Sequence, residues 1–393
     1  SSINLGLNVG SRTNVGFNTT MDFDELRIKY QTLLGLGFTA NVYYPVIIKF
    51  CAGPTPDCNT STSLSQTAFP ALVSNAGVTG ITLGTVTNVN NVVSTSTSDF
   101  GTITLPVGIA ATGYIEVKDQ LTVYPSGYFA GFEIANLSLL DLQLLTNTTI
   151  STYLDNVPRE SFAGNALLLG APVLGTSGRQ TVGFVTSMTF NKIRFTINQT
   201  VGLDVGATNV YNAIIKRYCT GPALDCNVIT SLIENTFPVN VDPNLTGITG
   251  VACSGCSINA AQNVIDSDVG NLSTITLTGG IAVNGAIAVK DVITTYPAGT
   301  YAGFEYQNAA LIGANVLDNI QIATYMNGSL VETSTNSTIL AAGSSLLGGS
   351  GRQIAGFVTT LPFNTIRISI TQAVGLNLGT TIVYRALVQN MCA

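Results

Sequence analysis

Residues 192–198 read Lys-Ile-Arg-Phe-Thr-Ile-Asn, with an apolar side chain at every second position. Residues 366–370 (Ile-Arg-Ile-Ser-Ile) and 24–31 (Asp-Glu-Leu-Arg-Ile-Lys-Tyr-Gln) show the same alternation. Successive side chains of a strand point to opposite faces of its sheet, so a period of two is typical of a half-buried strand. The three stretches therefore predict β-strands that each cover a hydrophobic core with one face.

These strands belong to an internal repeat. Residues 178–227 match residues 11–58, and residues 351–393 form a third copy that stops soon after its first cysteine. A different portion precedes two of them, because residues 103–134 match residues 275–306. We call this preceding portion the first half of the repeat and the Gly-Arg-Gln portion the second half. The sequence holds two full periods and one additional second half at its N-terminal end.

Turn signals separate the alternating stretches. Tyr-Pro-Ser-Gly at 124–127 and Tyr-Pro-Ala-Gly at 296–299 combine the fixed φ of proline with the positive φ that glycine accepts. Helical periodicity is weak and limited to short stretches at 61–67, 136–145 and 229–235. The pattern predicts an all-β fold of tandem antiparallel β-sandwich domains, of jelly-roll or immunoglobulin-like type.

The repeat sets the expected domain boundaries. Complete sandwiches are expected at 86–217 and 262–393, and a partial sandwich, the C-terminal half of a repeat, at 1–50. Residues 51–85 and 218–261 are rich in Asn, Thr, Ser, Gly and Pro and are expected to be disulfide-bearing connectors. The partial sandwich is expected either to belong to a longer tandem protein or to be completed by a neighbouring subunit through strand addition.

The chain has seven cysteines, most of them in close pairs. Two pairs share the pattern Cys-x-Gly-Pro-x-x-Asp-Cys, in which the Gly-Pro turn brings the chain back on itself, as a disulfide requires. The expected local disulfides are Cys51–Cys58, Cys219–Cys226 and Cys253–Cys256. Cys392 aligns with the first cysteine of the two long pairs and is a candidate for an intermolecular disulfide.

Zinc and redox chemistry are the alternatives for these cysteines. Cys219, Cys226, Cys253 and Cys256 would supply a four-thiolate zinc site, but the first copy has no counterpart of the last two. A redox Cys-x-x-Cys should open a helix in a βαβ unit, and no such pattern surrounds it. Three local disulfides, and therefore an oxidising extracellular compartment, are expected instead.

Composition excludes several classes of function. The chain has no histidine, which rules out Ser-His-Asp and Cys-His catalysis and histidine-ligated metal sites. Fifteen Lys and Arg against 21 Asp and Glu argue against a nucleic-acid partner. No uninterrupted apolar run reaches the length of a transmembrane helix. Only 9% of residues are charged, against about 25% in ordinary domains. A non-enzyme is expected.

The few charges recur between copies. Glu133 and Glu305 lie in the apolar Ala-Gly-Phe-Glu stretch, and Arg179 and Arg352 follow Gly-rich loops. The simplest interpretation is a structural ion pair in each copy that fixes the register of the sheet. The alternative pairs Glu133 with Glu160 for glycoside hydrolysis, although the chain has no tryptophan to serve as a sugar platform.

Calcium is the one ion that the residue types favour, and no other cofactor is expected. Asp266, Asp268 and Asn271 are spaced like the ligands of a loop site, and oxygen ligands are plentiful in this chain. The first copy offers only Asp99 at the corresponding place, which makes the site a weak candidate.

Several stretches carry a resemblance to a known group of proteins. YPAGTYAGFE (296–305), STYLDNVPRES (151–161) and GRQTVGFVTS (178–187) resemble tandem repeat domains of large secreted surface proteins of Bacteroidota, in the style associated with type IX secretion and gliding motility. The resemblance extends over nearly the whole chain. It implies an extracellular or cell-surface location and a structural or adhesive role, and it implies no particular chemistry.

Two functions are compatible with these observations. The first is a non-enzymatic structural subunit of an extracellular filament, sheath or surface fibre, whose partner is itself and whose sandwiches assemble by strand complementation between subunits. The alternative is a cell-surface adhesin or carbohydrate-binding module with polysaccharide as its partner. Candidate sugar-stacking residues for this alternative are Tyr43, Tyr44, Tyr128 and Tyr301.

Overall fold

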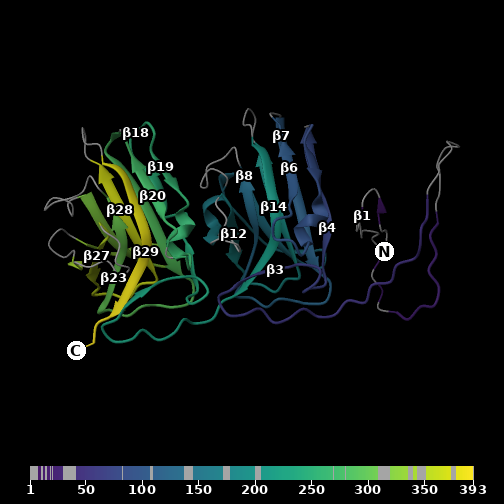
Figure 1. Ribbon diagram of the computed structural model, residues 1–393, viewed down its shortest axis with the longest axis horizontal. Coiled ribbons are helices and arrows are strands. Elements are labelled where there is room, and N and C mark those ends of the chain that lie inside the picture. Colours follow the sequence, from purple (N-terminus) through teal and green to yellow (C-terminus); the bar gives the residue numbers. More distant parts are fainter. Residues whose placement is uncertain are drawn as a thin grey trace.

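The computed structural model describes residues 8–9, 12–13, 16–17, 19, 21–29, 41–81, 83–106, 109–136, 145–170, 178–199, 205–268, 270–278, 280–308, 319–334, 340–342, 351–372 and 378–392. Within these ranges the chain forms two β-sandwiches that lie side by side, with the N-terminal segment running beyond the first (Figure 1). We call residues 58–219 the first domain and residues 226–392 the second domain. Among the described helices, none has the length and apolar character needed to cross a membrane.

The first domain is built from two antiparallel sheets. One sheet has the order β10 (Val157–Ala163), β9 (Thr148–Leu154), β13 (Lys192–Gln199), β7 (Ile109–Asp119) and β4 (Ala71–Ile81). The other has the order β11 (Leu168–Gly170), β12 (Gln180–Val185), β8 (Tyr128–Asn136), β14 (Gly206–Arg217), β6 (Gly101–Leu105) and β5 (Thr85–Thr87). The remaining elements are β3 (Ser61–Ser63), which pairs with β14, and the short 3-10 helices η1 (Val89–Val93) and η2 (Gly164–Ala166).

The second domain repeats this arrangement, with the place of β4 taken by two short strands. One sheet has the order β25 (Ser329–Thr333), β24 (Ile320–Met326), β28 (Thr365–Gln372) and β22 (Val283–Asp291), with β16 (Val239–Val241) and β17 (Gly247–Thr249) both on β22. The other has the order β26 (Leu340–Ala342), β27 (Gln353–Val358), β23 (Thr300–Gln307), β29 (Gly379–Asn390), β20 (Ser273–Leu277) and β19 (Ser257–Asn259). The remaining elements are β15 (Ile229–Ser231), η3 (Ala261–Ile265), and β18 (Ala252–Cys253) paired with β21 (Gly280–Ile281).

Extended to the whole domain, the first half of the repeat is residues 58–177 in the first domain and 226–350 in the second, and the second half is residues 178–219 and 351–392. Strands from the two halves alternate within each sheet. In the first domain β13 lies between β9 and β7, β14 lies between β8 and β6, and β12 lies between β11 and β8. The second-half strands β12, β13 and β14 are therefore never hydrogen-bonded to one another. The same holds in the second domain for β27, β28 and β29. Each sandwich requires both halves of the repeat to form its sheets.

The core is likewise shared between the halves. Phe132 of the first half packs on Phe195 of the second, with ring centroids 5.9 Å apart, and Tyr124 packs on Phe190 at 5.3 Å. All four side chains are buried. Aromatic rings bury large apolar areas, so these contacts stabilise the association of the two halves as well as the sheets themselves.

The expected fold class is confirmed, since every ladder pair between strands is antiparallel and the sheets pack as sandwiches. The alternating stretch at 192–198 lies in β13. The stretch at 366–370 lies in β28. The equivalent stretch near residue 24 is not a strand: residues 21–29 are exposed and outside any sheet. β1 (Asn8–Val9) and β2 (Arg12–Thr13) are the only strands described in this N-terminal part.

The predicted connectors need correction, because residues 51–85 and 218–261 supply parts of the sandwiches. β4 pairs with β7 along almost its entire length, and Phe69 and Phe237 lie in the hydrophobic core. Two register shifts, at Val73/Asn75 and Gly80/Ile81, interrupt the alternation of β4 and conceal it in the sequence. The stretches 61–67 and 229–235, which were predicted to be helical, instead begin with the strands β3 and β15. Most of the third, 136–145, lies outside the described residues.

Candidate functional site

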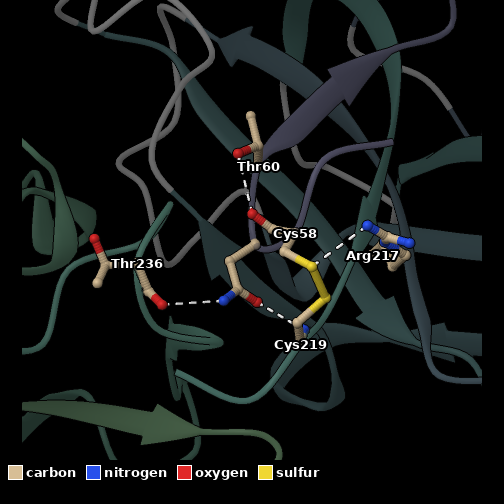
Figure 2. The surroundings of a disulfide bond; sticks show 6 residues. Cys58, Thr60, Arg217, Cys219 and Thr236 are labelled. Carbon is tan, nitrogen blue, oxygen red and sulfur yellow. Dashed lines mark hydrogen bonds between the residues drawn. A yellow bond between two sulfur atoms is a disulfide. The ribbon is translucent and has the colours of Figure 1, made fainter. Parts of the chain in front are cut away.

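Each domain is closed by a disulfide between its first and last residues. Cys58 bonds to Cys219 over a sequence separation of 161, and Cys226 bonds to Cys392 over 166. Figure 2 shows the first of these bonds, with Arg217 donating to the Cys58 sulfur at 3.4 Å. We call the two bonds the staples. They form because the chain enters and leaves each sandwich at one place, where the paired Cα atoms are 5.4 and 5.3 Å apart.

The staples correct two expected disulfides. Cys51–Cys58 and Cys219–Cys226 do not form, because the second cysteine of each Gly-Pro pattern starts a domain and bonds to the cysteine that ends that domain. Cys392 is likewise bonded within the chain. The pair Cys253–Cys256 is present as expected. Cys51 is the free cysteine of the described residues, and it is exposed.

An asparagine follows the first cysteine of each staple and holds the two ends together. The backbone of Asn59 has a φ of 58°, and its side-chain Oδ1 accepts a hydrogen bond from the Cys219 amide at 2.9 Å. Asn227 has the same φ, and its Oδ1 accepts from the Cys392 amide at 3.2 Å. Asparagine tolerates this left-handed conformation better than other side chains do. The Cys-Asn dipeptide is therefore a built feature of both domains.

The two domains meet at a joint that is part of one continuous sheet. β11 of the first domain pairs with β16 of the second through Leu169 and Val241. The Lys216 ammonium lies 2.8 Å from a carboxylate oxygen of Glu234, and both side chains are almost completely buried. A buried pair of this kind contributes specificity, because either partner alone would be a desolvated charge.

Further hydrogen bonds cross the same joint. Asn240 donates to the Tyr218 hydroxyl at 2.6 Å, and Asn59 donates to the carbonyl of Thr236 at 3.1 Å, a contact visible in Figure 2. Burial raises the pKa of Tyr218, which keeps its hydroxyl neutral. The two ends of the first domain are thus fixed to the beginning of the second, and the contacts at the joint are largely polar and buried.

The recurring Glu–Arg pairs both form. Arg179 lies 3.3 Å from Glu133, and Arg352 lies 3.8 Å from Glu305. Each guanidinium also stacks over a tyrosine of the last strand, Tyr211 in the first domain and its counterpart Tyr384 in the second. Burial raises the pKa of Glu305, against the opposing effect of the arginines nearby. These contacts connect β8 or β23 to the residue just before the neighbouring strand of the sheet, β12 or β27, and fit a structural role.

A second charged cluster was not predicted from the sequence. Glu116 on β7 lies 3.0 Å from Lys192 and 2.6 Å from Arg194, both on β13, and accepts a hydrogen bond from Ser74 at 2.6 Å. Burial alone would raise the pKa of Glu116, but the hydrogen bonds and charges around it outweigh this effect and lower the pKa. Only register could have revealed the cluster, because Glu116 and Arg194 are directly opposite in neighbouring strands.

The carboxylate pair considered for glycoside hydrolysis does not assemble. Glu133 is buried on β8 against Arg179, whereas Glu160 lies on β10 in the other sheet. Both oxygens of Glu160 accept hydrogen bonds from the backbone of Ser187 and Met188, at 2.9–3.1 Å. Glu332 of the second domain caps Thr360 and Leu361 in the same way. Glu160 and Glu332 each fix a turn, and Glu133 and Glu160 lie in different sheets.

The calcium candidates use their oxygens within their own loop. Asp266 accepts hydrogen bonds from the Asp268 amide at 2.6 Å and from the side-chain nitrogen of Asn271 at 2.8 Å. Asp268 accepts from the amide of Gly270 at 2.8 Å. Among the described residues, no cluster of three or more metal-binding side chains is present. The three residues form a hydrogen-bonded loop in this structure.

The candidate sugar-stacking tyrosines fall into two groups. Tyr301 is buried and Tyr128 half-buried, which leaves neither ring open as a platform. Tyr43 and Tyr44 are exposed and lie in the N-terminal segment, outside both sandwiches. Within the described residues of the two domains, Phe162 is the exposed aromatic side chain, and it stacks on Phe184 with ring centroids 4.4 Å apart.

Comparison with known proteins gives a limited result. No protein-family model matches the chain, and no curated protein matches it. Solved structures similar to it include the third CBM32 domain of a family 31 glycoside hydrolase from Clostridium perfringens (13% identity, 37% of this chain and 89% of that one, TM-score 0.22). The CBM22 tandem of Paenibacillus barcinonensis Xyn10C is 9% identical over 87% of this chain and 100% of that one, with a TM-score of 0.24.

Tandem CBM51 modules of a family 98 glycoside hydrolase from Streptococcus pneumoniae are 12% identical over 84% of this chain and 99% of theirs, with a TM-score of 0.19. All three matches have TM-scores far below 0.5, so no ligand or activity is carried over from them. The assignment of an antiparallel β-sandwich rests on the strand pairing of the chain itself.

Proposed function

We propose that this chain is a non-enzymatic structural segment of an extracellular surface fibre, in which consecutive sandwiches form a stiff rod. The joint between the domains is the observation that carries the proposal. A spacer with freely moving domains needs only an exposed polar linker. Here the joint instead has a strand pair, Leu169 with Val241, and the buried ion pair of Lys216 with Glu234.

The disulfides and the composition support the same proposal. Staples that close each domain are stable in an oxidising extracellular compartment. The recurring carboxylates Glu133, Glu305, Glu160 and Glu332 each have a structural partner. The resemblance to surface repeats of Bacteroidota agrees with this location and remains a prediction of the sequence.

Electron microscopy of the native source tests the structural role. Gold-labelled antibodies raised against the two domains should decorate fibres or a sheath outside the cell. Label that is confined to the cell interior, or to dispersed single molecules in the medium, would contradict the proposal. Small-angle scattering of the purified chain adds a second measurement: the two domains should scatter as one elongated rigid body, and a distribution of interdomain distances would contradict the stiff joint.

Carbohydrate binding is the second candidate function. The observation in its favour is the exposed ring of Phe162, which is held in place by the buried ring of Phe184 beneath it. A rigid exposed ring is what a sugar face stacks on. The equivalent place in the second domain is the buried Ser334, so any such site would belong to the first domain alone.

A glycan array separates the two candidates. Binding that disappears in Phe162→Ala, with the thermal midpoint unchanged within about 2 °C, would favour the carbohydrate-binding function. Tyr128→Phe serves as the matched control, because it retains an aromatic ring at a half-buried position. An array without any binding, together with labelled fibres, would leave the structural function as the only candidate.

A further inference from the structure

The N-terminal segment, residues 15–51, has the sequence of three strands, but its described residues are mostly exposed where strands of the two domains are buried. Phe23 aligns with Phe190 and Phe363, which are 0% exposed, yet Phe23 is 50% exposed. Ile47 is 75% exposed, although its counterparts Ile215 and Val388 are 0% exposed. Six other apolar side chains of the segment are also exposed, although their counterparts in the two domains are buried: Phe17, Leu26, Ile28, Val42, Tyr43 and Val46.

The strand order explains why the segment cannot bury these side chains alone. It corresponds to β12, β13 and β14, and in the first domain none of these strands pairs with another. Each is hydrogen-bonded only to strands of the first half. The described residues 21–29 and 41–57 accordingly form no sheet. A segment with strand-like sequence that exposes its apolar side chains and lies outside any sheet is a template for a complementary polypeptide.

Cys51 independently indicates what that polypeptide is. It aligns with Cys219 and Cys392, the closing cysteines of the two staples, and it is free and exposed. In both domains the partner of the closing cysteine is the cysteine that starts the first half, Cys58 or Cys226. Within residues 1–393 no such cysteine is left for Cys51, because both first halves are already stapled.

We propose that the described parts of this segment, mainly residues 21–29 and 41–51, are a docking surface for a first half of this same repeat, supplied from outside residues 1–393, and that Cys51 closes the resulting sandwich with a third staple. The occupant is defined by its chemistry. It carries strands equivalent to β6, β7, β8 and β9, the Tyr-Pro-x-Gly turn, and a Cys-Asn dipeptide at its start. The proposal goes beyond the proposed function and does not depend on it.

A second copy of this chain does not satisfy the segment. Residues 1–393 hold three second halves and two first halves, so copies of this stretch alone leave one second half per copy without a partner. In the described structure, both first halves are already bound by second halves of their own domains. Strand complementation between copies, which the sequence analysis expected, would therefore have to break one complete sandwich for each one it forms.

The expected contacts follow from the first domain. Ile28 takes the place of Phe195, which packs on Phe132 of the first half. Arg27 takes the place of Arg194, which bonds to Glu116 on β7. Within the described segment, Arg27 lies 3.3 Å from Glu25, and both side chains are highly exposed. An acidic side chain at the Glu116 position of the occupant would give Arg27 a buried partner.

The third staple forms by oxidation of two thiols. Cys51 and the first cysteine of the occupant together lose two protons and two electrons as the sulfur–sulfur bond forms. A disulfide-containing oxidant, such as a thiol–disulfide oxidoreductase or oxidised glutathione, accepts them by exchange and is reduced to two thiols. Docking brings the two sulfurs together, as it does in both complete domains.

A fused chain tests the docking directly. A copy of residues 58–177 is placed immediately before residue 11 of the full chain, which reproduces the junction between residues 177 and 178. After refolding with a glutathione couple, peptide mapping without reduction should find Cys51 bonded to the copied Cys58, and the free thiol should disappear. Amide exchange of residues 21–29 and 41–50 should slow by about 100-fold or more. Cys51 remaining free with unchanged fast exchange would overturn the proposal.

Matched variants control for non-specific effects. Ile28→Asp with Ile47→Asp should abolish the exchange protection in the fused chain and leave exchange unchanged in the original chain, where both side chains are exposed. Cys51→Ser in the fused chain should retain most of the protection, because the strands still pair. A change in amide exchange in the original chain carrying Ile28→Asp and Ile47→Asp, where no partner is docked, would contradict the assignment of these residues to a docking face.

Native material decides the matter if the fused chain does not fold. Non-reducing peptide mapping should find Cys51 linked to a peptide that begins a first half of the repeat. A link between two Cys51 residues would indicate a second copy as the occupant, and a free Cys51 thiol would show that no third staple exists. Either result overturns the proposal, whereas the absence of fibres in micrographs would affect only the proposed function.

Discussion

The two domains share one frame but differ in their interior charges. In the first domain Glu116 is directly opposite Arg194 in the β7–β13 ladder and also pairs with Lys192. In the second domain the corresponding positions of β22 and β28 hold Ala288 opposite Arg367. Without a carboxylate there, Arg367 donates instead to the carbonyl of Leu245 at 2.9 Å.

This difference shows which interactions specify the fold. Strand order, register and the staples are the same in both domains, although the buried carboxylate is present in only one. The ladder and the apolar core therefore define the sandwich, and the Glu116 cluster adds local stability that the second domain obtains in other ways. A buried ion pair is seldom essential where a neutral, well-packed alternative exists.

The largest effect is expected from removing a staple. Cys58→Ser with Cys219→Ser opens a loop of 161 residues, and Cys226→Ser with Cys392→Ser opens one of 166. Loop-closure entropy predicts a loss of about 4 to 5 kcal/mol in the domain concerned, and nearly the same loss for both. Urea unfolding followed by amide exchange in each domain measures it. A loss below about 1 kcal/mol in either domain would show that its staple contributes little.

Removing the carboxylate that distinguishes the domains should have the next largest effect. Glu116→Ala leaves the buried Lys192 without its counter-charge, which is expected to cost about 3 kcal/mol. The double change Glu116→Ala with Lys192→Thr copies the second domain, where Thr365 takes the place of Lys192, and should recover about half of that loss. Chemical denaturation of the first domain checks both variants. A double variant less stable than Glu116→Ala would contradict the equivalence of the two interiors.

Weakening the joint should lower the free energy of unfolding by a smaller amount. Its main effect should be that the two domains no longer unfold together. Glu234→Gln removes the charge that pairs with Lys216 and is expected to cost about 2 kcal/mol. Calorimetry should then show two separate unfolding transitions instead of one. Gln389→Ala is the control, because Gln389 occupies the place of Lys216 in the second domain; it should cost less than about 0.5 kcal/mol. Equal effects of the two changes would rule out a special role for the joint.

Lowering the pH should change the free energy of unfolding least of all. The change should have opposite signs in the two domains. The lowered pKa of Glu116 contributes stability at neutral pH that is lost as the pH falls through the folded-state pKa. Burial raises the pKa values of Glu305 and Asp291, so the folded second domain takes up protons first and gains relative stability over the same descent. Amide exchange of each domain between pH 7 and about pH 3, well below the ordinary Glu pKa of 4.5, measures this. Parallel loss in both domains would contradict the assignment.

The strands were predictable because alternation is a local property. Residues 192–198 and 366–370 were predicted as strands from a period of two and lie in β13 and β28. β4 was missed because its register shifts break that period. Its counterpart in the second domain is divided into the short strands β16 and β17, which carry still less periodicity.

The staples were mispredicted because pairing depends on where a domain closes. The Gly-Pro turn between Cys219 and Cys226 made local pairing plausible, but the turn connects the end of one domain to the start of the next. One signal was present in the sequence: Cys219 and Cys392 each end a complete repeat, and Cys58 and Cys226 each begin one. The Glu116 cluster gave no such signal, since its members are far apart in sequence and only the ladder brings them together.

The staples have a mechanical consequence. A pulling force along the chain enters the first domain at Cys58 and leaves it at Cys219, so the sulfur–sulfur bond transmits the load and the strands between them carry almost none. Reduction of that one bond would release 161 residues of hidden chain, or roughly 550 Å when fully extended. The extensibility of such a rod is therefore set by the thiol chemistry around it rather than by the strength of its sheets.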